Sequence, residues 1–166
     1  MSGEREKKEL ECAKWEPYME MGHPEIDAQH KRLIAEINKL CKELDNKEPD
    51  AERIKGHIKF LLAYAVEHFA TEEKVMKDIG YPGFLNHYNI HRWFEKQVRN
   101  LVNDYVKFGP THTMVVRIHH LLVDWLVSHI CGTDGDLRTY YKSYIKHEMN
   151  MVGGENTPSE GEESSQ

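Results

Sequence analysis

Length, composition and charge limit the classes of protein to which this chain can belong. Its 166 residues are enough for one domain with one hydrophobic core. The formal net charge is -6, and much of it comes from a C-terminal stretch without lysine or arginine, so the chain offers no basic footprint for nucleic acid. No apolar run reaches the roughly 18 residues of a membrane span, and residues 1–11 lack the apolar core of a secretory signal.

The three cysteines carry information about the redox environment. Cys12, Cys41 and Cys131 are odd in number and show no C-x-x-C spacing. This pattern is more typical of free thiols in a reducing cytoplasm than of a disulfide scaffold. We therefore expect a cytoplasmic protein in which Cys41 is a small core residue.

Both ends of the chain differ in composition from its middle. Residues 1–11 are charged, and we expect them to be flexible. The end of the chain is rich in Gly, Ser and Glu, which predicts a disordered acidic tail, placed at residues 149–166. Residues 12–148 are expected to form the one domain, beginning with an extended segment around Trp15 and Tyr18 that lies over the fold.

Two helices are expected in the first half of the domain, where apolar residues recur with a 3.6-residue period. The first spans about residues 24–45, because Pro24 suits the first position of a helix. The second spans about residues 51–79 and is ended by Gly80 and Pro82.

Two more long helices follow, and no stretch alternates like a β-strand. One is expected at about residues 84–108, ended by Gly109, and the next at about 111–131, ended by Gly132. A short helix at about 136–147 is expected to pack across one end. Long helices joined by short loops favour antiparallel neighbours, so the expected fold is all-α, an antiparallel up-down-up-down four-helix bundle.

Seven polar residues interrupt the apolar faces of these helices. On the second and third helices they come in pairs spaced i, i+4, which places each pair on one helix face. The last residue lies five positions beyond its predecessor, and we expect a glycine turn at Gly132 to fold it back toward the bundle axis. The set consists of His30, His68, Glu72, His87, His91, His129 and Asp134.

This set predicts a metal centre. A single inward histidine is more often a hydrogen-bonded core residue than a ligand, but seven polar groups from four helices are costly to bury unless each has a partner. Seven donors exceed the four ligands of one zinc ion, and nitrogen-rich ligation disfavours magnesium and calcium. We therefore expect two metal ions, joined by two carboxylates and a solvent-derived bridge. With three histidines on one ion and two on the other, one position stays open for a small ligand such as O2.

The residues around these positions resemble the signature of the hemerythrin family. The resemblance extends over about residues 15–144, and all seven ligand positions are filled. The long separations between ligands are similar to those of bacterial members. The matching segments are Ile26 to Lys31, His68 to Glu73 with Met76, the pair His87 and His91, and Trp125 to Ile130 with Asp134.

The resemblance implies a role for each residue. The cofactor would be two non-haem iron ions (Fe2+/Fe3+) with an oxo or hydroxo bridge. His87, His91 and His129 would hold one iron, and His30 and His68 the iron that binds O2, while Glu72 and Asp134 would bridge the two. Leu126 would line the O2 pocket, with Trp125 packed beside it.

The implied function is reversible O2 binding for storage, delivery or scavenging, without enzymatic activity. Two alternatives stay open: a sensor of O2, redox state or nitric oxide, and a di-iron enzyme such as a peroxidase. The expected partners are O2 and a protein that accepts the oxygen, with neither nucleic acid nor a membrane span, and the expected state is a monomer or weak oligomer. The other histidines are expected to be structural or exposed, namely His23, His57, His112, His119, His120 and His147.

Overall fold

The computed structural model describes residues 12–153, which are almost entirely helical. After a short 3-10 turn, η1 (Pro17–Met19), come three separate helices and then a fourth rod built of four consecutive pieces. No strand occurs among the described residues, so the prediction of an all-α four-helix fold is confirmed. The three helices are α1 (Pro24–Leu44), α2 (Ala51–Asp78) and α3 (Phe84–Phe108), and the rod consists of α4 (His112–Ile118), the π-helical η2 (His119–Trp125), α5 (Leu126–Cys131) and α6 (Thr133–Gly153).

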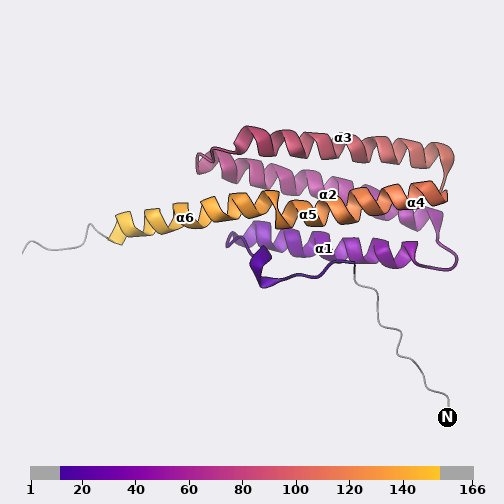
Figure 1. The fold of residues 1–166 in the computed structure, drawn as a ribbon, viewed down its shortest axis with the longest axis horizontal. Coiled ribbons are helices and arrows are strands. Elements are labelled where there is room, and N and C mark those ends of the chain that lie inside the picture. Colours follow the sequence, from indigo (N-terminus) through magenta and orange to yellow (C-terminus); the bar gives the residue numbers. More distant parts are fainter. Residues whose placement is uncertain (1–11, 154–166) are drawn as a thin grey trace, which may run out of the picture.

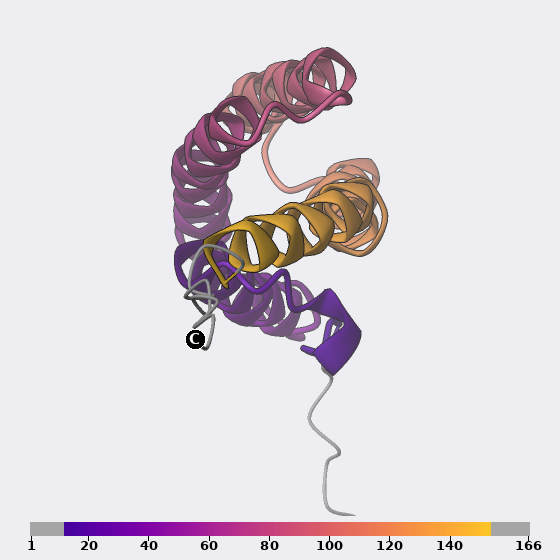
Figure 2. The same ribbon diagram turned by 90° about the vertical axis from the view of Figure 1, so that its left-hand side faces the viewer.

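The four rods lie side by side around a common interior. Figure 1 shows successive rods running in alternating directions, with α6 extending beyond the end of the other three. In the end view of Figure 2, α2 lies between α1 and α3, and the fourth rod closes the arrangement opposite α2. The arrangement is therefore the bundle that the short loops predict.

The helix boundaries follow the local chemistry of the chain. Pro24 occupies the first turn of α1, where its missing N–H would have no partner in any case, and the His23 side chain accepts a hydrogen bond from the Ile26 N–H. The Asp50 carboxylate caps α2. Gly109 ends α3 with a φ of 72°, a left-handed conformation that favours glycine.

The fourth rod has the predicted break at Gly132, where α5 ends and the chain makes a turn. The turn is right-handed, with φ -97° and ψ -76°, so α6 begins at the next residue, Thr133. The helix expected at 136–147 is the middle of the 21-residue α6, whose last residues reach into the stretch assigned to the tail. The remainder of that tail and the N-terminal stretch 1–11 lie outside the described residues.

The buried apolar residues form two clusters, separated along the bundle by a layer of polar side chains. The larger cluster includes Leu33, Phe69 and Ile130. The smaller one lies at the end of the bundle from which α6 extends and contains Met21, Ile26, Val75, Met76, Ile79 and Leu137. On α1, α2 and the fourth rod alike, the predicted ligands fall between members of the two clusters.

A disulfide joins the N-terminal segment to α1. Cys12 and Cys41 are bonded, so the prediction that they are free thiols is wrong, although Cys41 is buried in the core as expected. The segment runs back along α1, where Ala13 and Asn38 exchange two hydrogen bonds, and this reversal brings together cysteines 29 residues apart. Cys131 is a free thiol.

One helical stretch is long and apolar enough to cross a membrane by length and composition alone. It runs from His112 to Val152, which is the fourth rod of the bundle. Its apolar side chains Ile118, Leu122 and Leu126 are fully buried in the protein core. In all, 39% of the apolar window is buried inside the bundle, and these three side chains belong to that part.

Candidate metal centre

All seven predicted ligands meet in one layer inside the bundle. Each is at most 3% exposed. His30 comes from α1, His68 and Glu72 from α2, and two further histidines from α3. His129 lies on α5 and Asp134 in the first turn of α6.

His30 and His68 form the first of two histidine groups. Their Nε2 atoms lie 3.1 Å apart. His30 Nε2 is 3.1 Å from Asp134 Oδ2 and 3.7 Å from Glu72 Oε1, and His68 Nε2 is 3.6 Å from the same Glu72 oxygen. These four donor atoms lie within 4.8 Å of one another, close enough to bind a single metal ion.

His87, His91 and His129 form the second group. The Nε2 atoms of His91 and His129 are 3.1 Å apart. Asp134 Oδ1 lies 2.9 Å from His129 Nε2 and 3.1 Å from His87 Nε2. Glu72 Oε2 lies 3.4 Å from His91 Nε2 and 3.6 Å from His87 Nε2, which completes a set of five donors.

The two carboxylates are shared between the groups, one oxygen to each. Oε1 of Glu72 faces the two-histidine group and Oε2 faces the three-histidine group. Asp134 divides its oxygens in the same way. The layer therefore contains two adjacent donor groups, each able to hold a metal ion, with both carboxylates between them.

The chemistry of this donor set fits metal ions. Although the oxygens of Glu72 and Asp134 are buried, none of them makes a well-directed hydrogen bond to a described residue, and the same holds for His87 Nε2. Buried carboxylates without partners are costly, and cations at the centre would satisfy them together. Imidazole nitrogens mixed with carboxylate oxygens suit a transition metal.

Protonation of two histidines compensates part of this charge when no metal is bound. Burial opposes the charged form of His30 and His87, but the facing carboxylates of Asp134 and Glu72 outweigh it and raise the pKa of each histidine to about 9. Burial dominates at His68 and lowers its pKa to about 4. Despite their own burial, Glu72 and Asp134 have pKa values well below the usual range because the side chains of several histidines face them.

Two of the histidines are oriented from outside the layer by residues to which the sequence analysis assigned no role. His68 Nδ1 lies 3.1 Å from Gln29 Oε1, and the Gln29 amide donates to Thr71 Oγ1. His91 Nδ1 lies 3.0 Å from Glu73 Oε1, which also accepts from Arg92. Metal-bound histidines usually donate their outer N–H to such a partner, and this rule is the signal that could have identified Gln29 and Glu73.

Aromatic rings pack against the histidines of the second group. Phe69 stacks on His91 with ring centroids 3.8 Å apart, and Trp125 stacks on His129 at 4.8 Å. Trp125 thus lies against the three-histidine group, whereas the family resemblance placed it beside the O2 pocket of the other group. The tryptophan near His30 is Trp15, with centroids 6.4 Å apart. Leu126 is fully buried.

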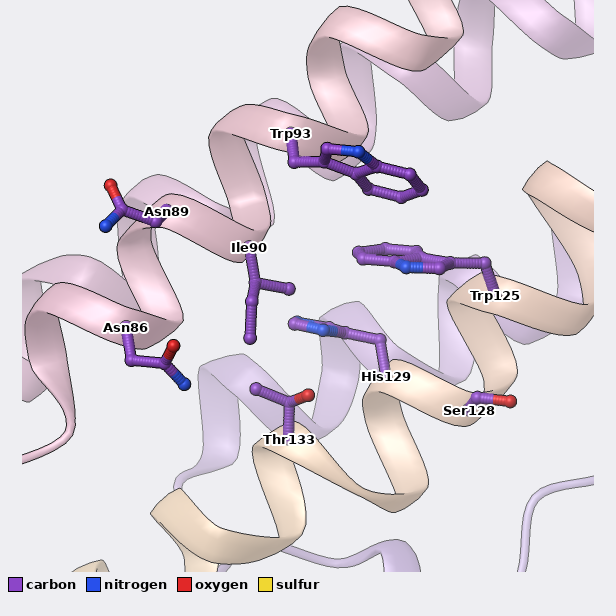
Figure 3. Close-up of a pocket in the computed structure, with 8 residues that line it drawn as sticks. All are labelled: Asn86, Asn89, Ile90, Trp93, Trp125, Ser128, His129 and Thr133. Carbon is purple, nitrogen blue, oxygen red and sulfur yellow. The ribbon is translucent and has the colours of Figure 1, made fainter.

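A surface pocket leads to the outer side of His129. Its volume is about 490 Å³, and α3 and the fourth rod line it. Figure 3 shows Trp93 and Trp125 lying close together at one side of the pocket, with the His129 ring next to Trp125 and Ile90 beside it. The second histidine group therefore borders this pocket through the side chain of His129, which is itself one of the lining residues.

Fold and site together define an all-α protein with a candidate metal site between the helices of a bundle. The model of the hemerythrin HHE cation binding domain matches residues 21–141 of the chain. This range includes all seven residues of the layer. The chain therefore belongs to the hemerythrin family.

Several curated bacterial proteins are similar over most of the chain. A bacteriohemerythrin of Pseudomonas aeruginosa (strain LESB58) is 32% identical over 138 residues, which are 83% of this chain and 84% of that protein. Bacteriohemerythrins of Stenotrophomonas maltophilia (strain R551-3) and Campylobacter jejuni subsp. jejuni serotype O:23/36 (strain 81-176) are 28% and 27% identical, and the matches span 86% and 96% of their lengths.

Proposed function

We propose that the protein binds O2 reversibly at a non-haem di-iron centre, for storage, delivery or scavenging of oxygen. The observation that carries this proposal is the division of Glu72 and Asp134, each with one oxygen toward either histidine group. Membership of the hemerythrin family supports it. A cytoplasmic location and an oxygen-accepting protein stay predictions.

The two groups offer unequal numbers of ligands. His87, His91 and His129 would hold one iron, and His30 and His68 the other. With both carboxylates counted on each side, the groups supply five and four donors. The group of His30 and His68 supplies one donor fewer, so an iron held there would keep a position open for O2. A pair of ferrous ions bridged by oxo or hydroxo would supply the two electrons that reversible O2 binding requires.

Residues of the protein determine the charge, orientation and water content of the open position at His30 and His68. The carboxylates of Glu72 and Asp134 neutralise part of the positive charge of the metal pair. Gln29 fixes the ring of His68 through its Nδ1 atom, which keeps Nε2 directed at the centre. Fully buried apolar side chains such as Leu126 and Phe69 exclude water from the layer, and exclusion of water limits irreversible oxidation.

An anaerobic-to-aerobic optical titration of the iron-loaded, reduced protein tests the proposal. We expect two irons per chain and visible charge-transfer bands that appear under O2 and vanish under argon. His68→Gln should abolish the reversible bands. His57→Gln, on the same helix but outside the layer, should retain them.

A different outcome would contradict reversible binding without contradicting the site. If the loaded protein contains two irons but passes directly to a stable diferric spectrum, the sensor and enzyme alternatives gain over the carrier. If iron does not exceed one per chain, the di-iron assignment itself fails.

A further inference from the structure

A second cluster of metal-binding side chains lies outside the histidine layer. The sulfurs of Cys12 and Cys41 and a ring nitrogen of His119 are all within 4.8 Å of one another. We propose that the reduced form of this cluster binds one zinc-type divalent cation through Cys12, Cys41 and His119. The Cys12–Cys41 disulfide is then the oxidised, metal-free state of the same site.

Three separate parts of the fold bring these ligands together. Cys12 belongs to the N-terminal segment, Cys41 lies near the end of α1, and His119 is the first residue of η2. Cys41 lies eleven residues beyond His30 on α1, or about 16 Å along the helix. The cluster shares no residue with the layer, so the inference does not depend on the proposed O2 function.

The cluster is accessible to a metal ion from solvent. It faces a surface pocket of about 190 Å³ that is lined by Cys12, Cys41, Leu44, Asp45, Val115 and His119. The His119 side chain is 46% exposed, whereas Cys41 is buried. The carboxylate of Asp45 adds negative charge to the pocket wall and favours a cation there.

The ligand types and their spacing suit zinc. Two thiolates and one imidazole are a known ligand set for a zinc ion that keeps a fourth position for solvent. Tetrahedral zinc with Zn–S bonds of about 2.3 Å requires sulfurs about 3.8 Å apart. The Cα atoms of Cys12 and Cys41 are 6.4 Å apart, so side-chain rotation can separate the sulfurs to this distance. His119 Nδ1 lies 3.5 Å from Asp124 Oδ1, and a zinc-bound histidine commonly has a carboxylate partner of this kind.

The conversion between the two states is a balanced exchange. A dithiol reductant gives two electrons and two protons to the Cys12–Cys41 bond and becomes a disulfide itself. The two thiols formed then release two protons as they bind the divalent cation as thiolates. The site is therefore closed to metal under oxidising conditions and open under reducing ones.

Zinc binding to the iron-loaded full chain tests the proposal. The protein is reduced anaerobically with a water-soluble phosphine, freed of the reagent and given one equivalent of Zn2+. We expect one bound zinc per chain, and X-ray absorption at the zinc edge should show two sulfur neighbours at about 2.3 Å. The same protein with the disulfide intact should show no sulfur neighbour.

Two histidines of the fourth rod provide a matched pair of variants. His119→Gln should weaken zinc binding at least tenfold in competition with a chelator. His112→Gln, on the same rod, should leave it within twofold, because His112 belongs to no candidate metal group among the described residues. Both residues are exposed, so both variants should fold, which circular dichroism checks. Zinc without sulfur neighbours in the reduced protein, or equal zinc affinity in the two variants, would overturn the proposal.

Discussion

Glu72 and Asp134 are buried anions at the centre of the bundle, and in the metal-free protein only protonated histidines balance them. His30 and His87 carry this balancing positive charge, since the pKa of each is about 9 in the folded protein against an ordinary value of 6.5. His68 has the opposite tendency and is held neutral by burial. The stability of the metal-free protein should therefore depend on pH in a characteristic way.

We expect the metal-free protein to be most stable near pH 6.5. A histidine whose pKa is higher in the folded than in the unfolded protein stabilises the fold fully at any pH below its unfolded pKa. The contribution of His30 and His87 is therefore complete below pH 6.5 and is lost as the pH rises through about 9. On the acid side, the lowered pKa values of His68, Glu72 and Asp134 make stability fall as these groups take up protons. Thermal unfolding of chelator-treated protein at pH 5, 6.5 and 9 measures the profile.

The metal-loaded protein is the control for this profile. Its histidines must be deprotonated to bind metal, so its melting temperature should not fall between pH 6.5 and 9. A metal-free protein whose melting temperature is constant over that range would contradict the assigned roles of His30 and His87.

A substitution at Gln29 tests whether this residue positions the ligand His68. Gln29→Ala removes the oxygen that lies 3.1 Å from His68 Nδ1, and loss of such a partner typically weakens metal binding about 10- to 100-fold. We expect this loss for one of the two irons, the one held by His30 and His68. Gln97→Ala, a glutamine of α3 outside the layer, is the control, and iron titration under a competing chelator is the measurement. Equal iron affinity in both variants would show that Gln29 does not position His68.

At the scale of elements, the joint between α5 and α6 decides whether Asp134 reaches the layer. His129 and Asp134 are five residues apart, which does not match one face of a regular helix. The backbone at Gly132 departs from regular helix geometry, with a ψ of -76°. A Cβ atom at this position would lie 3.0 Å from the Ser128 carbonyl oxygen, so the joint fits glycine.

Alanine substitutions at two helical glycines should have opposite effects. Gly132→Ala forces the joint to shift and is expected to destabilise the protein by about 1 kcal/mol or more and to lower iron occupancy, because Asp134 moves. Gly56→Ala lies in α2 with open space around the added Cβ and should stabilise by about 0.5 to 1 kcal/mol. Denaturant unfolding and iron analysis of both variants check this. If Gly132→Ala changed neither the free energy of unfolding nor the iron content, the joint between α5 and α6 would not require glycine.

Local sequence signals predicted the first three helices well and the fourth rod less well. Pro24 and Gly109 mark helix ends by their own backbone restrictions, and the observed ends of α1 and α3 lie within one residue of the expected ones. Gly132 carries the same signal and ends α5, but its right-handed backbone lets α6 begin at the next residue. Packing of Leu137 into the smaller core cluster and the contacts of Asp134 accompany this conformation, and neither is visible in a local pattern.

At the scale of the whole molecule, the sequence predicted the members of the layer but not the contacts around them. Inward-facing histidines interrupt an apolar period, so His30 or His91 can be recognised on a single helix. The partnership of Gln29 with His68 joins two helices, and the bond between Cys12 and Cys41 depends on a segment that reverses along α1. Such pairings follow from the assembled bundle and have no periodic signal.

The polar layer between the two core clusters has a consequence for the cooperativity of the bundle. The smaller cluster, with Ile26, Met76 and Leu137, is joined to the larger one through a layer of buried polar groups rather than through continuous apolar packing. On removal of metal we expect two units that open separately, and amide hydrogen exchange should accelerate around the smaller cluster while the larger one stays protected. Uniform acceleration along all four rods would contradict this. Opening of one end then gives iron a route into the centre that does not require the whole chain to unfold.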